Sequence, residues 1–202
     1  GLISFAGGFP SPKTFPVQEL AELFQAVIES DGADILQYGA SEGDVQLKAA
    51  IKKLEKIDIH DDEMLITVGS TNAIFYMTKI FIEPGEIIYT EAPSFLGSLV
   101  TFEALGADVR GIPLDKEGIS CKHLTEEISR AKKEGKIGNF IYVIPEFQNP
   151  SGLTMSLKRR KELLEIVKEN DLIILEDSPY EQLRYSGKKE TSLFELARKI
   201  YN

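Results

Sequence analysis

The sequence predicts an α/β fold with three layers, in which helices flank both faces of a mostly parallel sheet. From residue 64 onward, short apolar runs alternate with stretches of helical periodicity. Runs that are apolar throughout are typical of strands buried on both faces, and the helices between them supply the crossovers that parallel strands require. Polar segments follow several of these runs, and the ligands of such sheets bind beyond the carboxyl ends of the strands.

The N-terminal third of the chain carries two helical patterns joined by the glycine-rich connection LQYGASEGD. In residues 17–30 one helical face collects five apolar side chains, namely Leu20, Leu23, Phe24, Val27 and Ile28. In residues 45–56 the same spacing of three to four recurs at Leu47, Ile51 and Leu54. A spacing of this kind predicts an amphipathic helix in each stretch.

Strands and helices then alternate to the end of the chain. We expect strands at MLITV (64–68), EIIYT (86–90), DVRGIPL (108–114), NFIYVI (139–144) and LIILE (172–176). The helices are expected over 69–82, 94–105, 122–134 and 156–170. A further helical pattern precedes the last residues, RKIYN, and the chain opens without a methionine, so we expect that both ends are cut.

Composition excludes several classes of protein. The formal net charge of −9 disfavours a nucleic-acid surface, because phosphate binding needs clustered Lys and Arg. The basic runs KKLEK and KRRK lie within helical patterns and are interpreted as solvated helix faces. The single cysteine, Cys121, rules out a disulfide framework, and the isolated His60 and His123 predict no metal site. No run approaches the length of a membrane span and no signal-peptide pattern opens the chain, so we expect a cytoplasmic protein.

Four segments follow apolar runs and carry side chains suited to a ligand: GSTNA (69–73), EAPSF (91–95), NPSG (149–152) and EDSPY (176–180). Ser70, Thr71 and the first amides of a helix suit a phosphate, because free N–H groups and the helix dipole favour an anion there. Phe95 suits stacking on a flat ring. Asn149 suits a hydrogen bond to a ligand oxygen, and Asp177 is expected at the end of the neighbouring strand.

Each segment also has a simpler interpretation. Ser70 is a plain helix N-cap, Phe95 an aromatic residue packed under a loop, and NPSG a type I turn. In the simpler interpretation, Asp177 only caps the end of a strand. In favour of a shared site, all four segments occur in order and each directly follows a predicted strand.

A ligand that satisfies all four segments has a phosphate, a flat ring, a ring nitrogen and a ring oxygen. Pyridoxal 5′-phosphate fits this description. Its pyridinium ring withdraws electrons from the substrate's α-carbon. Asp177 would keep the ring nitrogen protonated, because an opposite charge nearby favours the charged form. Asn149 and Tyr180 would hydrogen-bond the ring oxygen.

In the order AGGFPSPKTFP, LQYGASEGDVQLKAAI, ITVGSTNAI, EAPSF, NPSG and EDSPYEQLRY, the sequence resembles the class I/II aminotransferases of the aspartate-aminotransferase fold. Among them it is most similar to the 2-aminoadipate/kynurenine aminotransferase subgroup. The resemblance covers essentially the whole chain and implies the major domain of the PLP-dependent transferases, present incompletely. It divides the chain into residues 1–40, which contribute to a small domain and the dimer interface, and residues 41–202, an incomplete cofactor-binding large domain.

The resemblance also implies roles for single residues. Tyr38 corresponds to a tyrosine that reaches across a homodimer interface to the cofactor phosphate; its simpler interpretation is a turn aromatic before Gly39. Gly8 corresponds to a backbone position near the substrate. The cofactor-binding set is Tyr38, Ser70, Thr71, Phe95, Asn149, Asp177 and Tyr180. At Phe95 the subgroup usually carries Tyr, so stacking is kept and the hydroxyl is lost.

No catalytic residue is assigned within the chain. The family's Schiff-base lysine lies on a later strand, and Lys188 and Lys189 come too early to replace it. We therefore expect an inactive fragment of an enzyme that transaminates 2-aminoadipate, aromatic or branched amino acids with a 2-oxo acid such as 2-oxoglutarate. Two alternatives stay open: an aminotransferase-like sensor domain of a transcriptional regulator, and another PLP enzyme of the same fold, such as a C–S lyase.

Overall fold

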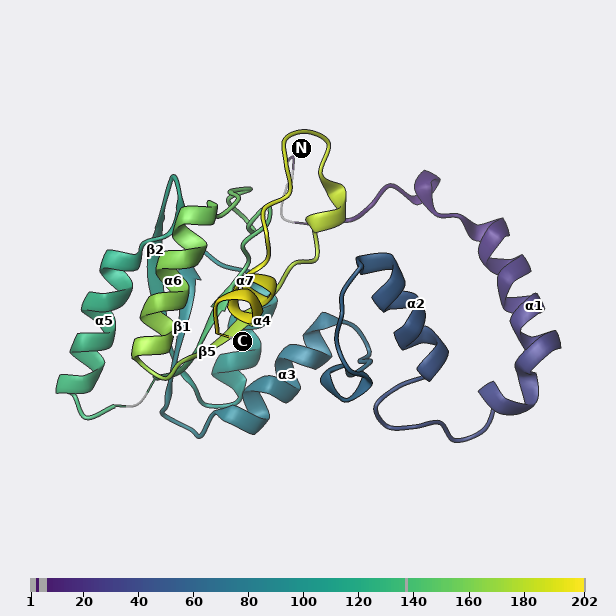
Figure 1. The fold of residues 1–202 in the computed structure, drawn as a ribbon, viewed down its shortest axis with the longest axis horizontal. Helices are drawn as coiled ribbons and strands as arrows, with labels where there is room; N and C mark the ends of the chain where they lie inside the picture. The colour runs from purple at the N-terminus through teal and green to yellow at the C-terminus, as the bar shows by residue number, and fades with distance from the viewer. Residues whose placement is uncertain (1–2, 4–6, 137, 202) are drawn as a thin grey trace. The chain divides into compact units, whose positions relative to one another are not determined.

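A computed structural model describes residue 3, residues 7–136 and residues 138–201 of the chain. The chain divides into two compact units, Gly1–Ile66 and Thr67–Asn202 (Figure 1). Within the described ranges, none of the helices has the length and apolar content needed to cross a bilayer.

The N-terminal unit contains both helices predicted for it. Its elements are η1 (Pro12–Thr14), α1 (Val17–Ile35), α2 (Val45–Glu55) and η2 (Asp61–Glu63). Helix α2 begins after Asp44, whose side chain accepts a hydrogen bond from the Leu47 amide at 2.7 Å. Its C-cap is Lys56, which directly follows Glu55 and takes the left-handed conformation with φ 55°. A capping carboxylate at one end and a left-handed residue at the other are common helix boundary signals.

The predicted strand at 64–68 is absent, and this prediction is wrong. Ile66 N donates to Glu42 O at 3.1 Å, but none of the strands described pairs with this segment. Leu65 is 55% exposed and Val68 is 90% exposed, so the run is not buried either. An apolar run becomes a strand only where a neighbouring strand satisfies its backbone groups.

The C-terminal unit carries the sheet. Its elements are α3 (Ser70–Phe81), β1 (Ile87–Ala92), α4 (Leu96–Ala104), β2 (Asp108–Asp115), β3 (Gly118–Ile119), α5 (Cys121–Lys133), β4 (Gly138–Val143), α6 (Leu157–Glu169), β5 (Ile173–Glu176), η3 (Glu181–Leu183) and α7 (Leu193–Tyr201). Among the described strands the order is β3-β2-β1-β4-β5. The predictions of β1, β2, β4 and β5, and of the helices between them, are confirmed.

Strands β2, β1, β4 and β5 are parallel to one another, as the alternating pattern predicts. The short β3 was not predicted. It pairs antiparallel with β2 through Leu114↔Ile119 and begins directly after the turn with Gly118, whose φ of 119° favours glycine. The sheet is therefore mostly parallel with one antiparallel edge.

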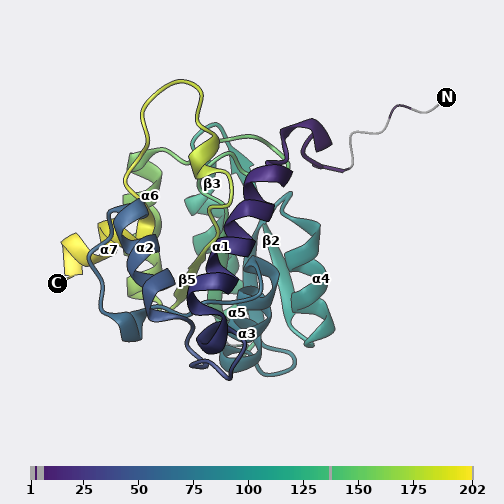
Figure 2. The same cartoon turned by 90° about the vertical axis from the view of Figure 1, so that its right-hand side faces the viewer.

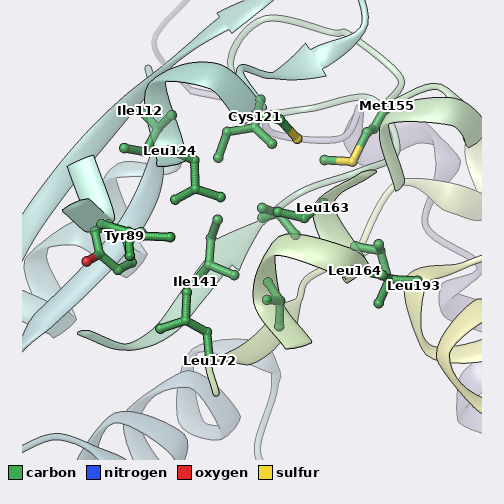
Figure 3. Close-up of a cluster of buried hydrophobic side chains, with 14 of the residues drawn as sticks. Tyr89, Ile112, Cys121, Leu124, Ile141, Met155, Leu163, Leu164, Leu172 and Leu193 are labelled. Atoms are coloured by element: carbon green, nitrogen blue, oxygen red, sulfur yellow. The ribbon is translucent and has the colours of Figure 1, made fainter. Parts of the chain in front are cut away.

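Side chains of the central strands alternate between two core clusters, one on each face of the sheet. Ile87 and Tyr89 of β1, with Ile141 and Val143 of β4, join α5, α6 and α7 in the first core cluster (Figure 3). The second core cluster consists of Ile74, Ile82, Ile88, Phe102, Phe140, Tyr142 and Ile144. Helices α6 and α7 lie on one side of the strands and α4 on the other (Figure 2). The three-layer α/β fold is thereby confirmed.

Candidate functional site

The carboxyl ends of β1, β4 and β5 lie next to one another at one edge of the sheet. Thr90 of β1 pairs with Tyr142 of β4, and Val143 of β4 pairs with Glu176 of β5. The three segments that follow these strands therefore start from the same edge. This confirms that Asp177 follows the strand next to the one that precedes Asn149.

Asp177 is fixed by two hydrogen bonds at the end of β5. Its amide donates to Val143 O at 2.9 Å, and its Oδ2 accepts from Tyr142 Oη at 2.6 Å. Burial raises the pKa of the Asp177 carboxyl above its usual value, and the bond from Tyr142 acts in the opposite direction. The carboxylate is thus held by a specific donor, and its role toward a ligand stays a prediction.

Asn149 lies in the loop after β4 and contacts Tyr180, which lies in the loop after β5. Its Nδ2 donates to Tyr180 Oη at 3.2 Å, and both residues are half-buried. The Asn149–Pro150 peptide is cis, and the chain does turn here, since Gly152 N donates to Gln148 O at 2.6 Å. The predicted pair of ring-oxygen partners is therefore brought together, and the roles of its two members stay predictions.

Gln148 closes this turn and ties it to the segment after β1. Its Oε1 accepts from Ser151 N at 2.9 Å and from Ser151 Oγ at 2.6 Å. Its Nε2 donates to Pro93 O at 2.8 Å. The Asn149 amide takes no part in these bonds and donates to Tyr180 instead. The sequence reasoning missed Gln148, although its place directly before NPSG was a usable signal.

Glu91 is a second residue that the sequence reasoning missed. It is 2% exposed near the end of β1, and its Oε2 accepts from Ile144 N at 3.0 Å. Burial raises the pKa of Glu91 to about 7, against the opposing effect of bonds from Ile144 and Gln148. A buried carboxyl group beside a candidate site is a recognised functional signal.

Phe95 shows the packing that its simpler interpretation requires. It is half-buried and packs against the second core cluster. A Cβ added at Gly97 would lie 2.6 Å from Phe95 Cζ, so the glycine makes room for the ring. The ring is thus fixed at the corner between β1 and α4. Stacking on a ligand stays a prediction.

Ser70 and Thr71 are the first two residues of α3, and both are exposed. The N-cap is Gly69, with φ 76°, and no side chain caps the helix within the described residues. The interpretation of Ser70 as an N-cap is therefore wrong. The first-turn amides of a helix have no partner inside it, which is the usual basis of a phosphate site. Ile74, one turn further along α3, belongs to the second core cluster. Phe95 packs against the same cluster.

These residues fit pyridoxal 5′-phosphate by the chemistry of their side chains. The uncapped start of α3 suits the phosphate, the Asp177 carboxylate a ring nitrogen, and the Asn149–Tyr180 pair a ring oxygen. The carboxylate, the amide and the phenol follow adjacent strands.

Gly8 and Tyr38 belong to the N-terminal unit. A Cβ added at Gly8 would meet nothing within 4 Å, and Tyr38 is 99% exposed. Their roles stay predictions.

Comparison with known proteins gives a consistent result. A family model described as Aminotransferase class I and II matches residues 5–201. An aromatic-amino-acid aminotransferase of Thermococcus litoralis is 43% identical over 92% of this chain and 46% of its own length. A 2-aminoadipate transaminase of Thermus thermophilus is 37% identical over 98% of this chain and 48% of its own. The chain spans about half the length of these curated relatives.

Solved structures agree in fold. The crystal structure of an archaeal alanine:glyoxylate aminotransferase matches with a TM-score of 0.89 and 36% identity, over 98% of this chain and 50% of that one. A relative of another kind is YisV of Bacillus subtilis, an uncharacterized HTH-type transcriptional regulator. It is 32% identical over 93% of this chain and 38% of its own length.

Proposed function

Because the chain belongs to the class I and II aminotransferases, we propose that the whole protein transfers the amino group of an amino acid to a 2-oxo acid, with pyridoxal 5′-phosphate as cofactor. The observation that carries this proposal is the Asp177 carboxylate. It is held by Tyr142 at the edge where the Asn149–Tyr180 pair also lies. These groups follow adjacent strands and suit the two polar positions of one heteroaromatic ring. The carboxylate suits the ring nitrogen, and the amide and phenol suit the ring oxygen.

The residues of this chain would hold and tune the cofactor. When bound, pyridoxal phosphate draws electrons away from the bonds at the substrate's α-carbon. Asp177 would hold a proton at the ring nitrogen, and Asn149 with Tyr180 would orient the ring through its oxygen. Phe95 would cover one ring face, while Ser70, Thr71 and the first-turn amides of α3 would bind the phosphate. We assign the Schiff-base lysine to no residue of this chain.

The substrates are proposed from the named relatives. We favour 2-aminoadipate and aromatic or branched amino acids as amino donors, and 2-oxoglutarate as the acceptor. We also propose a homodimer in which residues 1–40 contribute to the interface, Tyr38 reaches the partner's cofactor phosphate, and Gly8 lies near the substrate. Residues 41–202 then belong to the large domain.

The test uses the full-length protein. We expect that it retains the visible absorbance of the cofactor after dialysis and forms glutamate from 2-aminoadipate and 2-oxoglutarate. Asp177→Ala should lower kcat by about 10- to 150-fold, because a hydrogen bond to a charged group contributes roughly 1.5–3 kcal/mol.

The matched control is Asp115→Ala. Asp115 ends β2 at the same edge of the sheet, but its carboxylate pairs with Arg159 at 3.0 Å. This variant should keep its cofactor and its turnover. A full-length protein that retains no cofactor, or an Asp177→Ala variant as active as the Asp115→Ala control, would overturn the proposal.

A second candidate function is a cofactor-sensing domain of a transcriptional regulator. The similarity to YisV favours it. A regulator of this kind would bind pyridoxal phosphate and a specific DNA fragment without releasing glutamate. Gel-shift binding to the upstream region of its own gene, measured beside the turnover assay, separates the two functions. Another enzyme of the same fold, such as a C–S lyase, would be recognised by its products.

A further inference from the structure

We propose that Tyr142 is a positioning residue, whose hydroxyl keeps the proton shared by Asp177 and the cofactor on the ring nitrogen. The inference rests on the proposed function, because it concerns the group that Asp177 would hold. It adds a residue that no motif in the sequence singled out. Tyr142 lies inside a buried strand, so the sequence alone indicates only a packing role for it.

The register of the sheet places the side chain of Tyr142 next to that of Asp177. Tyr142 of β4 pairs with Leu175 of β5. Side chains alternate along a strand, so Asp177, two residues beyond Leu175, lies on the same face as Leu175 and Tyr142. The result is the 2.6 Å hydrogen bond from Tyr142 Oη to Asp177 Oδ2. This short distance is typical of a hydroxyl bonded to a carboxylate.

The tyrosine ring itself has little freedom to move. Tyr142 is 0% exposed, and its strand lies between β1 and β5. Its ring meets Phe102 edge-on, with centroids 5.4 Å apart and planes at 72°. A hydroxyl fixed in this way is preorganised, so the donated bond holds one carboxylate oxygen in place and sets the direction of the other.

The bond also decides where a shared proton resides. A hydrogen bond to a carboxylate favours its ionised form, whereas burial of Asp177 favours the neutral form. If the donor is removed, the carboxyl becomes more basic. Asp177 would then take the shared proton, forming an O–H bond on its carboxyl group as the bond between that proton and the ring nitrogen breaks. Without this proton on its ring, the cofactor would withdraw electrons less strongly.

The experiment uses the full-length holoenzyme, loaded with pyridoxal phosphate that is isotopically labelled at the ring nitrogen. Nitrogen NMR then reports directly whether this atom carries a proton. In Tyr142→Phe the resonance should move toward that of an unprotonated pyridine. Turnover should fall about tenfold in kcat with little change in KM, as expected for one hydrogen bond to a charged group.

Tyr89→Phe is the matched control. Tyr89 is also a buried tyrosine, 1% exposed, but it lies on β1 and belongs to the first core cluster on the opposite face. Both variants lose one buried hydroxyl from the sheet, so both report general effects on folding. Only Tyr142→Phe should move the nitrogen resonance, and adding Tyr142→Phe to Asp177→Asn should have no further effect on kcat.

A second variant keeps the test decisive if Tyr142→Phe does not fold. Replacing Tyr142 by a ring-fluorinated tyrosine retains the hydroxyl and makes it a stronger donor, so the resonance should move the opposite way, toward full protonation. A nitrogen resonance that is the same in wild type and in the soluble Tyr142 variants would overturn the inference. Failure of the wild-type protein to retain the labelled cofactor would instead overturn the proposed function.

Discussion

At the scale of single residues, the candidate site depends on buried polar groups whose partners come from neighbouring strands. Glu91 shows this clearly, because its carboxyl group accepts a hydrogen bond from Ile144 N across the sheet and carries a pKa of about 7. Burial is the main cause, since it disfavours the charged form. The charge of this group should therefore respond to pH close to neutrality.

We predict that Glu91 makes stability fall as pH rises from 4.5 to about 7. In this window the unfolded chain has released the proton and the folded chain still binds it, so ionisation favours unfolding. Glu91→Gln removes this contribution. The free energy of unfolding of the full-length apo variant should exceed that of wild type by an amount that grows across the window. The difference should reach at most about 3 kcal/mol at pH 7 and above.

Thermal melting midpoints of both proteins, measured at intervals across this pH range, test the prediction. The exposed Glu103 of α4 supplies the control variant, Glu103→Gln, which should follow the wild-type curve. Curves for Glu91→Gln and wild type that stay parallel would show that Glu91 does not titrate in this window.

At the scale of elements, α6 anchors both ends of the loop that carries Asn149. Arg160 of α6 is 0% exposed. Its Nη2 donates to Pro145 O at 3.1 Å and to Glu146 Oε1 at 2.6 Å, and its Nε donates to Met155 O at 3.0 Å. Glu146 also pairs with Arg184, which follows η3. One buried carboxylate therefore links the loop after β4 to the segment after β5.

We expect that Arg160→Met destabilises the full-length protein by about 3–5 kcal/mol, because it removes the donors of two buried carbonyl groups and one partner of a buried carboxylate. The denaturation midpoint in urea measures this loss. Lys158→Met, an exposed change on the same helix, should stay within about 0.5 kcal/mol of wild type. A loss below about 1 kcal/mol for Arg160→Met would mean that the loop is held by other contacts.

At the scale of the whole molecule, the described sheet ends at β5 with an apolar groove. In the described sheet, β5 pairs with β4 alone. A cavity of about 760 Å³ opens between α6, β5 and α7, and Ile174, Leu175, Phe194 and Ala197 are among its lining residues. An open strand edge next to apolar surface is a typical site of association.

We predict that the 202-residue chain, produced alone, associates with itself through this groove. Phe194 is 45% exposed on α7, so Phe194→Glu should reduce the associated fraction. Light scattering during size-exclusion chromatography, over a range of concentrations, measures this fraction. Tyr185→Glu, which changes a 95% exposed aromatic residue outside the groove, is the control. Equal association of the two variants would place the contact elsewhere.

Most of the fold could be predicted because burial on both faces leaves a local signature. The runs that became β1, β4 and β5 each contain three or more consecutive apolar residues, and the helices between them repeat apolar residues at helical spacing. The wrong prediction of a strand at 64–68 arose from the same use of local composition. The composition of this segment is that of a buried strand, yet strand formation also needs a partner, which composition does not report.

The order of residues along the chain determined which groups follow which strand, and hence that Asn149 and Asp177 start from one edge of a parallel sheet. Only the tertiary structure decided the contacts that these groups make. Strand register placed Tyr142 against Asp177, and loop closure placed Gln148 against Pro93. The physical reason is that periodicity is a local property, whereas a hydrogen bond between residues 35 or 55 positions apart depends on how the whole sheet packs.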